Sequence, residues 1–387
     1  MADSFLKMDM NSLQTQVLLS PYLSLDEQKT LQNLAEKYQM SSHVWIASSG
    51  SSKKENESLK LVALSKRALS VSATAVNAHL QVCTGDVWGL SLPTFHVGGL
   101  GILIRAQLAG VSCVPCLIEK WNPASFVQLL QKNEVTLTSM VPTQVYDCVL
   151  QQLKSPPKLR AVLVGGAALN ASLYREARQL GWPLLPCYGM TETCSQIATA
   201  SFKSLESEDF PSMTLLSHVQ ISVDPQQAAW IRSSALLTGY AYQQSGTDFF
   251  VDPKVNQAWK IPDQVFIEGD RLTPLGREED FVKILAEGIS LSRLRDRWVQ
   301  AAMKFQVPVS GFELLAVPDA RSGMALLLVV ENQLAENPSW KKMLDALQKD
   351  SLKIEWPTRY HQIVKIPRSS LGKVLKESLY QRIHEGL

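Results

Sequence analysis

The sequence lacks a dominant charge, a long apolar run and an obvious targeting segment. Its 38 Lys and Arg residues nearly balance 36 Asp and Glu residues, for a net charge of +2. Bulk electrostatic attraction to nucleic acid or to an anionic membrane is therefore not expected. No window reaches the roughly 18 apolar residues of a membrane span, and residues 1–11 lack the apolar core of a signal peptide. We expect a cytoplasmic protein without a membrane span.

Cysteine is also sparse, with six residues in the chain. Only Cys113 and Cys116 have metal-like spacing, and no second pair or nearby histidine would complete a zinc site. We therefore expect free thiols in a reducing compartment and no metal at this pair. The chain also lacks the Gly-Lys-Ser/Thr ending of a P-loop, which disfavours that class of nucleotide hydrolases.

What the chain does have is a regular alternation of apolar runs. Its 387 residues exceed what one core usually holds, so we predict two domains, at 1–276 and 277–387. The first is expected to be α/β, with helix-covered, mainly parallel sheets. Short runs after Phe202 predict a small antiparallel or barrel-like section, and the second domain is predicted to be α+β. The main predicted strands are 87–92, 111–114, 137–141, 161–164 and 184–187, and the main predicted helices are 67–80, 123–132, 144–153 and 171–180.

The first candidate site segment is the hydroxyl-rich run Ala47-Ser-Ser-Gly-Ser-Ser52. Such a turn can wrap backbone N–H groups around phosphate oxygens. A lysine would add a point charge, and Lys60 at the start of the next strand is preferred over Lys53 or Lys54. A solvated loop is the alternative interpretation of this composition.

Two further segments each follow an apolar strand, as ligand-binding loops of parallel sheets do. Gly165-Gly166-Ala167 permits a base to stack flat on the backbone, with Tyr188 facing it. In the run Tyr188–Thr193, Thr191 could bond a phosphate and Glu192 could hold Mg²⁺, which prefers a carboxylate with phosphate oxygens. A tight turn with a solvent-facing glutamate remains the alternative.

Three single residues complete the set. His96, before a glycine pair, could gate a pocket or simply be hydrogen-bonded at a helix start. Asp263 with Arg277 could bind ribose hydroxyls or form surface ion pairs. Lys373, in a loop bracketed by Pro367 and Gly372, could neutralise a carboxylate approaching an α-phosphate, or be an ordinary exposed lysine.

Taken in order, these blocks resemble the adenylate-forming superfamily of acyl-CoA synthetases, luciferases and peptide-synthetase adenylation domains. The resemblance covers residues 44–380 and is most specific at Tyr188–Thr193 and Pro367–Lys373. Leu92–Leu100, Ser139–Gln144 and Leu159–Ala168 are most similar to the o-succinylbenzoate–CoA ligases of menaquinone biosynthesis. The resemblance implies ATP, Mg²⁺ and CoA as cofactors and co-substrates, and a carboxylic acid as substrate.

The resemblance also implies roles for individual residues and a small domain that rotates about Glu279 between two half-reactions. Lys373 would act in acyl-adenylate formation, and CoA would then take the acyl group. The implied contacts are Ser49, Gly50, Ser51 and Lys60 with the β- and γ-phosphates, Gly165, Gly166 and Tyr188 with adenine, Thr191 with the α-phosphate, Glu192 with the metal, Asp263 and Arg277 with ribose, and His96 with the acyl pocket.

The chain departs from the superfamily pattern in several places. The phosphate loop lacks its second Gly and its Pro, and about 46 residues precede it, as expected of a variant with a shortened first subdomain. The usual Gly-Gly after the hinge is Leu285-Ala286, which lines the expected CoA channel. Transfer to a carrier protein or amine, and nucleotide binding without catalysis, are therefore alternative functions. The acid's identity and the oligomeric state, a homo-oligomer included, are left open.

Overall fold

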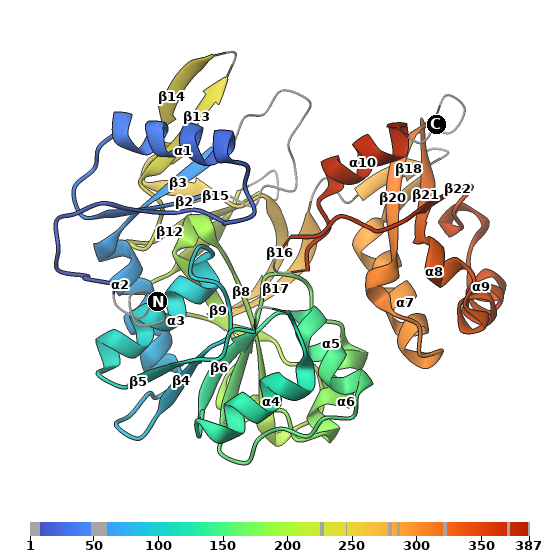
Figure 1. Ribbon diagram of the computed structural model, residues 1–387, viewed down its shortest axis with the longest axis horizontal. Helices are drawn as coiled ribbons and strands as arrows, with labels where there is room; N and C mark the ends of the chain where they lie inside the picture. The colour runs from blue at the N-terminus through green and yellow to red at the C-terminus, as the bar shows by residue number, and fades with distance from the viewer. Residues whose placement is uncertain are drawn as a thin grey trace. The chain divides into compact units, whose positions relative to one another are not determined.

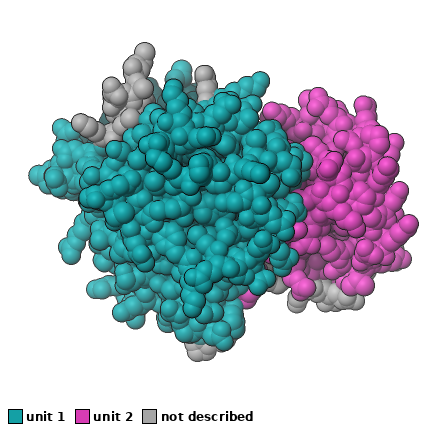
Figure 2. Space-filling view, turned by 90° about the horizontal axis from the view of Figure 1, so that it is seen from below, with its two compact units in different colours: residues 1–169, 174–261, 265–274 teal, residues 170–173, 262–264, 275–387 magenta. Residues whose placement is uncertain are grey.

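The computed structural model describes the chain except for residues 1–7, 48–59, 119, 225–227, 245, 278–280, 285–286, 320–322, 370–371 and 386–387. Two compact units are present (Figure 2). Unit 1 comprises residues 1–169, 174–261 and 265–274, and unit 2 comprises residues 170–173, 262–264 and 275–387. Within the described ranges, no helix has the length and apolar character needed to cross a membrane.

The largest element of unit 1 is a nine-stranded sheet of order β16-β17-β10-β9-β8-β7-β6-β4-β5 (Figure 1). The strands β4 to β8 run parallel, as predicted, whereas β8–β9, β9–β10 and β10–β17 are antiparallel pairs. The bounds are β4 (Val87–Leu90), β5 (Ser112–Pro115), β6 (Leu137–Met140), β7 (Ala161–Val164), β8 (Leu184–Met190), β9 (Ser195–Thr199), β10 (Met213–Leu215), β16 (Asp263–Glu268) and β17 (Arg271–Arg277).

Helices cover this sheet, most of them through one apolar side, whereas α3 is buried on all sides from Gly99 to Ala106. α2 and α3 bury Val76 and Ile102 against strand residues Leu137 and Leu163, and α4 buries Phe126 and Leu130. The predicted helices 67–80, 123–132, 144–153 and 171–180 are confirmed within a few residues. Their bounds are α2 (Lys66–His79), α3 (Val97–Ala109), α4 (Pro123–Lys132), α5 (Pro142–Leu150) and α6 (Ala171–Gln179).

The antiparallel section predicted after Phe202 is present, but its strands are divided among three sheets, and β10, β16 and β17 belong to the nine-stranded sheet. β13 and β14 extend a five-stranded sheet of order β1-β2-β3-β13-β14, and β11, β12 and β15 form a three-stranded sheet. Strand β13 pairs antiparallel with β3, so that Tyr240 lies opposite Val62. The bounds are β1 (Gln16–Leu18), β2 (His43–Ala47), β3 (Lys60–Ser65), β11 (Gln220–Val223), β12 (Ala229–Arg232), β13 (Gly239–Gln244), β14 (Thr247–Val251) and β15 (Ala258–Lys260).

The first helix, α1 (Leu25–Lys37), begins at a capping box, as the pattern Ser24-Leu-Asp-Glu27 predicts. Ser24 Oγ accepts a hydrogen bond from Glu27 N, and Glu27 Oε2 accepts one from Ser24 N. Leu31 and Leu34 are buried. Leu25, however, is 83% exposed.

Unit 2 is α+β, as predicted. Its central sheet has the order β20-β21-β22, and a separate hairpin is formed by β18 and β19. Trp298 and Trp340 belong to the core on one side, and Ile366 and Leu379 to the core on the other. The bounds are β18 (Phe281–Ile284), β19 (Glu287–Ser290), β20 (Phe312–Asp319), β21 (Gly323–Glu331), β22 (Arg359–Ile363), α7 (Leu291–Lys304), α8 (Asn332–Ala335), α9 (Pro338–Asp350) and α10 (Lys376–Glu385).

Candidate active site

The site is built around a tight turn, Thr191–Thr193, between β8 and β9. A Cβ on Gly189 would lie 1.9 Å from the carbonyl oxygen of Ser195, so only glycine allows the chain to fold back this closely. Thr193 Oγ1 closes the turn by accepting from Met190 N at 3.1 Å and donating to Ser195 O at 2.8 Å. The turn is therefore rigidly braced, and it presents Thr191 and Glu192 half-buried.

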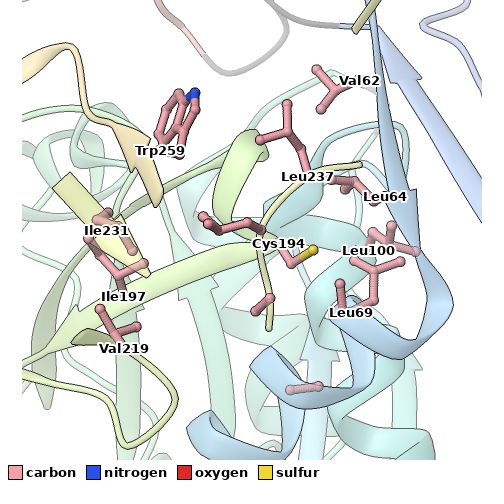
Figure 3. Close-up of a cluster of buried hydrophobic side chains, with 14 of the residues drawn as sticks. Val62, Leu64, Leu69, Leu100, Cys194, Ile197, Val219, Ile231, Leu237 and Trp259 are labelled. Atoms are coloured by element: carbon pink, nitrogen blue, oxygen red, sulfur yellow. The ribbon is translucent and has the colours of Figure 1, made fainter. Parts of the chain in front are cut away.

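The residue after this turn anchors it in the core of unit 1. Cys194 adopts a left-handed conformation with φ of 51° and is only 2% exposed. Its side chain lies in an apolar cluster that includes Leu64 and Leu100 (Figure 3). A left-handed non-glycine residue costs free energy, and apolar burial offsets that cost. The position of Glu192 is thus determined by packing that reaches β3 and α3.

Glu192 is held at both its backbone and its side chain. Its carbonyl oxygen accepts from Leu237 N at 2.8 Å, and its Oε1 accepts from the hydroxyl of Tyr240 at 3.1 Å. The ring of Tyr240 in turn faces Lys60, whose Nζ lies 4.0 Å from the ring centroid. Burial, and then the Glu192 carboxylate, raise the pKa of Tyr240, so its hydroxyl remains a donor. Two predicted site residues thereby contact one side chain, Lys60 at the ring of Tyr240 and Glu192 at its hydroxyl.

The surroundings of Glu192 fit a magnesium ion. Among the described residues, its Oε2 receives no hydrogen bond, and no group of three or more His, Cys, Asp or Glu side chains forms a metal cluster. Mg²⁺ commonly takes one or two carboxylates together with substrate phosphates, rather than a cage made of protein alone. A single half-buried carboxylate with one free oxygen matches that requirement.

The predicted adenine segment lies at the carboxyl ends of two neighbouring parallel strands. Val164, the last residue of β7, pairs with Pro186 of β8. A Cβ on Gly165 would come within 2.8 Å of Cys187 Sγ, and Gly166 has φ of +84°. Tyr188 follows Cys187 on the same strand. The structure thus brings Gly165, Gly166 and Tyr188 to the same edge of the sheet.

His96 lies directly before α3, as its N-cap residue. Its ring centroid is 4.7 Å from that of Phe95, and burial lowers its pKa to about 4, so the imidazole is neutral at physiological pH. The second glycine after His96 is Gly99. A Cβ at this position would lie 2.3 Å from the carbonyl oxygens of Leu92 and Pro93, so only glycine fits there. This geometry is compatible with a pocket wall and with a helix-start histidine.

Arg105 is a buried cation that the sequence analysis missed. It is 2% exposed, and burial lowers its pKa to about 10. Its Nη2 donates to Ser195 Oγ at 3.0 Å and its guanidinium lies over the ring of Trp88, but within the described part of the chain it forms no ion pair with a carboxylate. The only indication of this in the sequence is that Arg105 lies within an apolar helical run, Gly98–Ala106.

Several predicted site residues lie outside this cluster or outside the described residues. Asp263 is half-buried at the start of β16, and Arg277 ends β17 with its side chain not described. Ser49, Gly50, Ser51 and the hinge residue Glu279 lie outside the described residues, as do Leu285 and Ala286.

Lys373 lies in unit 2, in a loop closed by its own hydrogen bonds. Ser369 N donates to Lys373 O at 2.7 Å, and Gly372 N donates to Ser369 O at 2.8 Å. Arg368 braces the loop by donating to Gly372 O and to Ser310 O, both at 2.9 Å. Gly372 has φ of +75°, which favours glycine. Lys373 is half-buried, and its backbone is held by these hydrogen bonds.

Comparison with known proteins supports the predicted resemblance. Residues 58–228 match the family model of AMP-binding enzymes. The 2-succinylbenzoate–CoA ligase of Bacillus pumilus is 26% identical over 324 residues, covering 80% of this chain and 63% of that protein. The ligase of the same name from Lactococcus lactis is 26% identical over 307 residues, covering 76% and 62%. The chain thus spans somewhat under two thirds of these relatives.

Solved structures agree on the fold. The o-succinylbenzoate CoA synthetase (MenE) of Bacillus subtilis with ATP and magnesium aligns with a TM-score of 0.70 and 21% identity, over 87% of this chain and 69% of that one. The same protein with its acyl-adenylate OSB-AMP aligns with a TM-score of 0.69 and 21% identity, over 87% and 68%. The predicted α/β architecture and the resemblance to the adenylate-forming superfamily are confirmed.

Proposed function

We propose that the chain is an AMP-forming acid–CoA ligase that converts o-succinylbenzoate to its CoA thioester, as in menaquinone biosynthesis. The relatives named 2-succinylbenzoate–CoA ligase support the reaction, and the AMP-binding match supports the nucleotide. Six free thiols agree with a reducing compartment, and we place the reaction in the cytoplasm.

One observation carries this proposal: Lys60 and Glu192, from blocks far apart in the sequence, meet on Tyr240. A cation beside a carboxylate at a strand-end turn suits a metal-bound triphosphate. In this assignment Lys60 binds the β- and γ-phosphates together with Ser49, Gly50 and Ser51. When bound at Glu192, Mg²⁺ would neutralise phosphate charge and orient the leaving pyrophosphate.

The remaining nucleotide contacts are assigned to residues at the edge of the nine-stranded sheet where β7 and β8 end. Gly165 and Gly166 present flat backbone to adenine, and Tyr188 covers it from the adjacent strand. Thr191 donates to the α-phosphate from the braced turn. Asp263, with Arg277, is assigned to the ribose hydroxyls.

The acid is held on the other side of the same turn. Arg105, which is buried and has no carboxylate partner among the described residues, would pair with the carboxylate of the substrate that is not activated. Neutral His96 would form the wall of the acyl pocket and exclude water. A dicarboxylate therefore suits this site better than a simple fatty acid does.

In the first half-reaction, an oxygen of the substrate carboxylate attacks the α-phosphorus, and pyrophosphate leaves. Lys373 would stabilise the charge that develops between the carboxylate and the α-phosphate. In the second, the CoA thiol gives up its proton and attacks the acyl carbonyl, and AMP leaves with the carboxylate oxygen. The two domains, 1–276 and 277–387, would rotate about Glu279 between these steps.

The test is pyrophosphate release measured across a panel of acids, with ATP, Mg²⁺ and CoA. We expect release that depends on o-succinylbenzoate, followed by consumption of the CoA thiol. Pyrophosphate release that leaves CoA unchanged would instead favour transfer to a carrier protein or an amine, which the Leu285-Ala286 departure motivates. Absence of release with every acid would favour a nucleotide-binding protein without catalysis.

A further inference from the structure

Tyr240 joins the two charged groups of the site, and nothing in the sequence analysis assigned it a role. Its hydroxyl donates to Glu192 Oε1 at 3.1 Å, and its ring lies 4.0 Å from Lys60 Nζ. These contacts come from three separate segments, β3, β13 and the turn after β8. A tyrosine can hold both because its hydroxyl end is polar and its ring face attracts cations.

The tyrosine is held by its neighbours in the sheets. The indole of Trp259, on β15 and 7% exposed, lies near the phenol of Tyr240 and opposes the rise of its pKa. The backbone of β13 pairs with β3 on one side and with β14 on the other, which fixes the strand in register. The hydroxyl donates to Glu192, and the strand register keeps the ring against Lys60.

We propose that Tyr240 is a positioning residue that sets the metal-binding orientation of Glu192 and the phosphate-binding position of Lys60. This inference rests on the proposed function, because it assigns Glu192 to the metal and Lys60 to the phosphates. Partners that orient a metal-binding carboxylate typically change metal affinity by about 10- to 100-fold when removed. Loss of a cation–π contact would separately release the lysine.

The two contacts can be separated by substitution. Tyr240→Phe keeps the ring under Lys60 and removes only the donor to Glu192, whereas Tyr240→Leu removes both. Tyr242→Phe is the matched control. Tyr242 lies on the same strand, opposite Lys60, and stacks on Phe249 with ring centroids 5.4 Å apart, but among the described residues its hydroxyl makes no hydrogen bond to Glu192. Trp259→Phe is a second variant, which removes the indole N–H beside the phenol of Tyr240.

The experiment measures Mn²⁺ binding by electron paramagnetic resonance in the presence of a non-hydrolysable ATP analogue, and the analogue's own affinity without metal. For Tyr240→Phe we expect the Mn²⁺ dissociation constant to rise about tenfold while metal-free nucleotide affinity stays unchanged. For Tyr240→Leu we expect both Mn²⁺ binding and metal-free nucleotide binding to weaken. Trp259→Phe should shift Mn²⁺ binding in the same direction by a few-fold, and Tyr242→Phe should shift neither.

The outcomes separate this inference from the proposed function. If the wild-type chain binds the metal–nucleotide pair and folded Tyr240→Phe binds Mn²⁺ equally well, the positioning role is overturned and the proposed function stands. If Tyr240→Phe does not fold, unchanged Mn²⁺ binding by Trp259→Phe overturns the role instead. If the wild-type chain binds neither nucleotide nor metal, the proposed function is overturned, and the role of Tyr240 with it.

Discussion

The guanidinium of Arg105 donates a 3.0 Å hydrogen bond from Nη2 to the hydroxyl of Ser195. This contact joins α3, which begins after His96, to the strand that follows the Glu192 turn. An acid bound at Arg105 would therefore lie beside the residues assigned to the nucleotide. A positive charge buried this deeply is costly unless a negative group pairs with it. We infer that the missing negative group is the substrate.

Arg105→Met should lower activity without lowering stability. Loss of a buried charge partner should reduce kcat/KM for o-succinylbenzoate by about 10²-fold, with little effect on an analogue whose second carboxylate is amidated. Because burial lowers the pKa of Arg105 only to about 10, the folded state still holds the charge at pH 7. The unfolding free energy of the variant should therefore be unchanged or about 1 kcal/mol higher. Equal losses of activity with both substrates would contradict the assignment.

Gly189→Ala should destroy the turn that carries Glu192. The new Cβ would lie 1.9 Å from the Ser195 carbonyl oxygen, so the backbone must shift. We expect a loss of about 3 kcal/mol of unfolding free energy in urea denaturation, at the upper end for overpacking. Gly85→Ala is the control, because nothing lies within 4 Å of its Cβ position, and it should change stability by less than about 0.5 kcal/mol. Similar stabilities for the two variants would refute this account of the turn.

Asp86 should contribute stability that disappears in acid. Burial alone would raise its pKa, but Arg160, Thr136 and the Cys83 amide hydrogen-bond the carboxylate and lower the pKa to about 2. Because this value lies below the unfolded value of about 3.9, the contribution is complete above pH 4 and is lost as the pH falls towards 2. Asp86→Asn should lose about 2 kcal/mol at pH 7 and show a flatter acid limb. Parallel curves of unfolding free energy for the wild type and Asp86→Asn between pH 7 and pH 3 would contradict this role of Asp86.

Lys373→Ala should affect only the first half-reaction. Adenylation should fall by about 10²- to 10³-fold, because one transition-state charge donor is lost. Transfer of the acyl group from supplied acyl-adenylate to CoA should stay within about twofold of wild type, since Lys373 is not assigned to that step. Lys365→Ala, an exposed lysine near the same loop, is the control. Rapid-quench measurement of each half-reaction decides the matter, and equal losses in both would contradict the role.

The local features of the fold followed directly from the sequence. The capping box at Ser24 and Glu27 and the strand at 161–164 are found where their patterns predict them, because each depends on neighbouring residues only. The strands after Phe202 were correctly expected to be antiparallel, but their division between sheets was not foreseen. That division depends on the long-range pairing of β13 with β3, which no local pattern encodes.

In the candidate site, too, only the residues that belong to local motifs could be predicted from the sequence. Glu192 and Lys60 could be selected because their motifs are local, whereas Tyr240 is functional only through the register that places it between them. Arg105 was missed because a charged residue in an apolar helix has no spacing signature. Its significance is its burial without an acidic partner in the part of the chain that the structure describes. Residues of the phosphate loop and the hinge stay predictions, since Ser49–Ser51 and Glu279 lie outside the described residues.

The most direct test of the central claim follows one oxygen atom. o-Succinylbenzoate labelled with ¹⁸O in its carboxylates is incubated with the chain, ATP, Mg²⁺ and CoA, and the products are analysed by mass spectrometry. The proposed reaction predicts a CoA thioester together with AMP that carries one ¹⁸O, because the attacking carboxylate oxygen leaves on the α-phosphate. AMP without label, or label found in inorganic phosphate, would contradict activation through an acyl-adenylate.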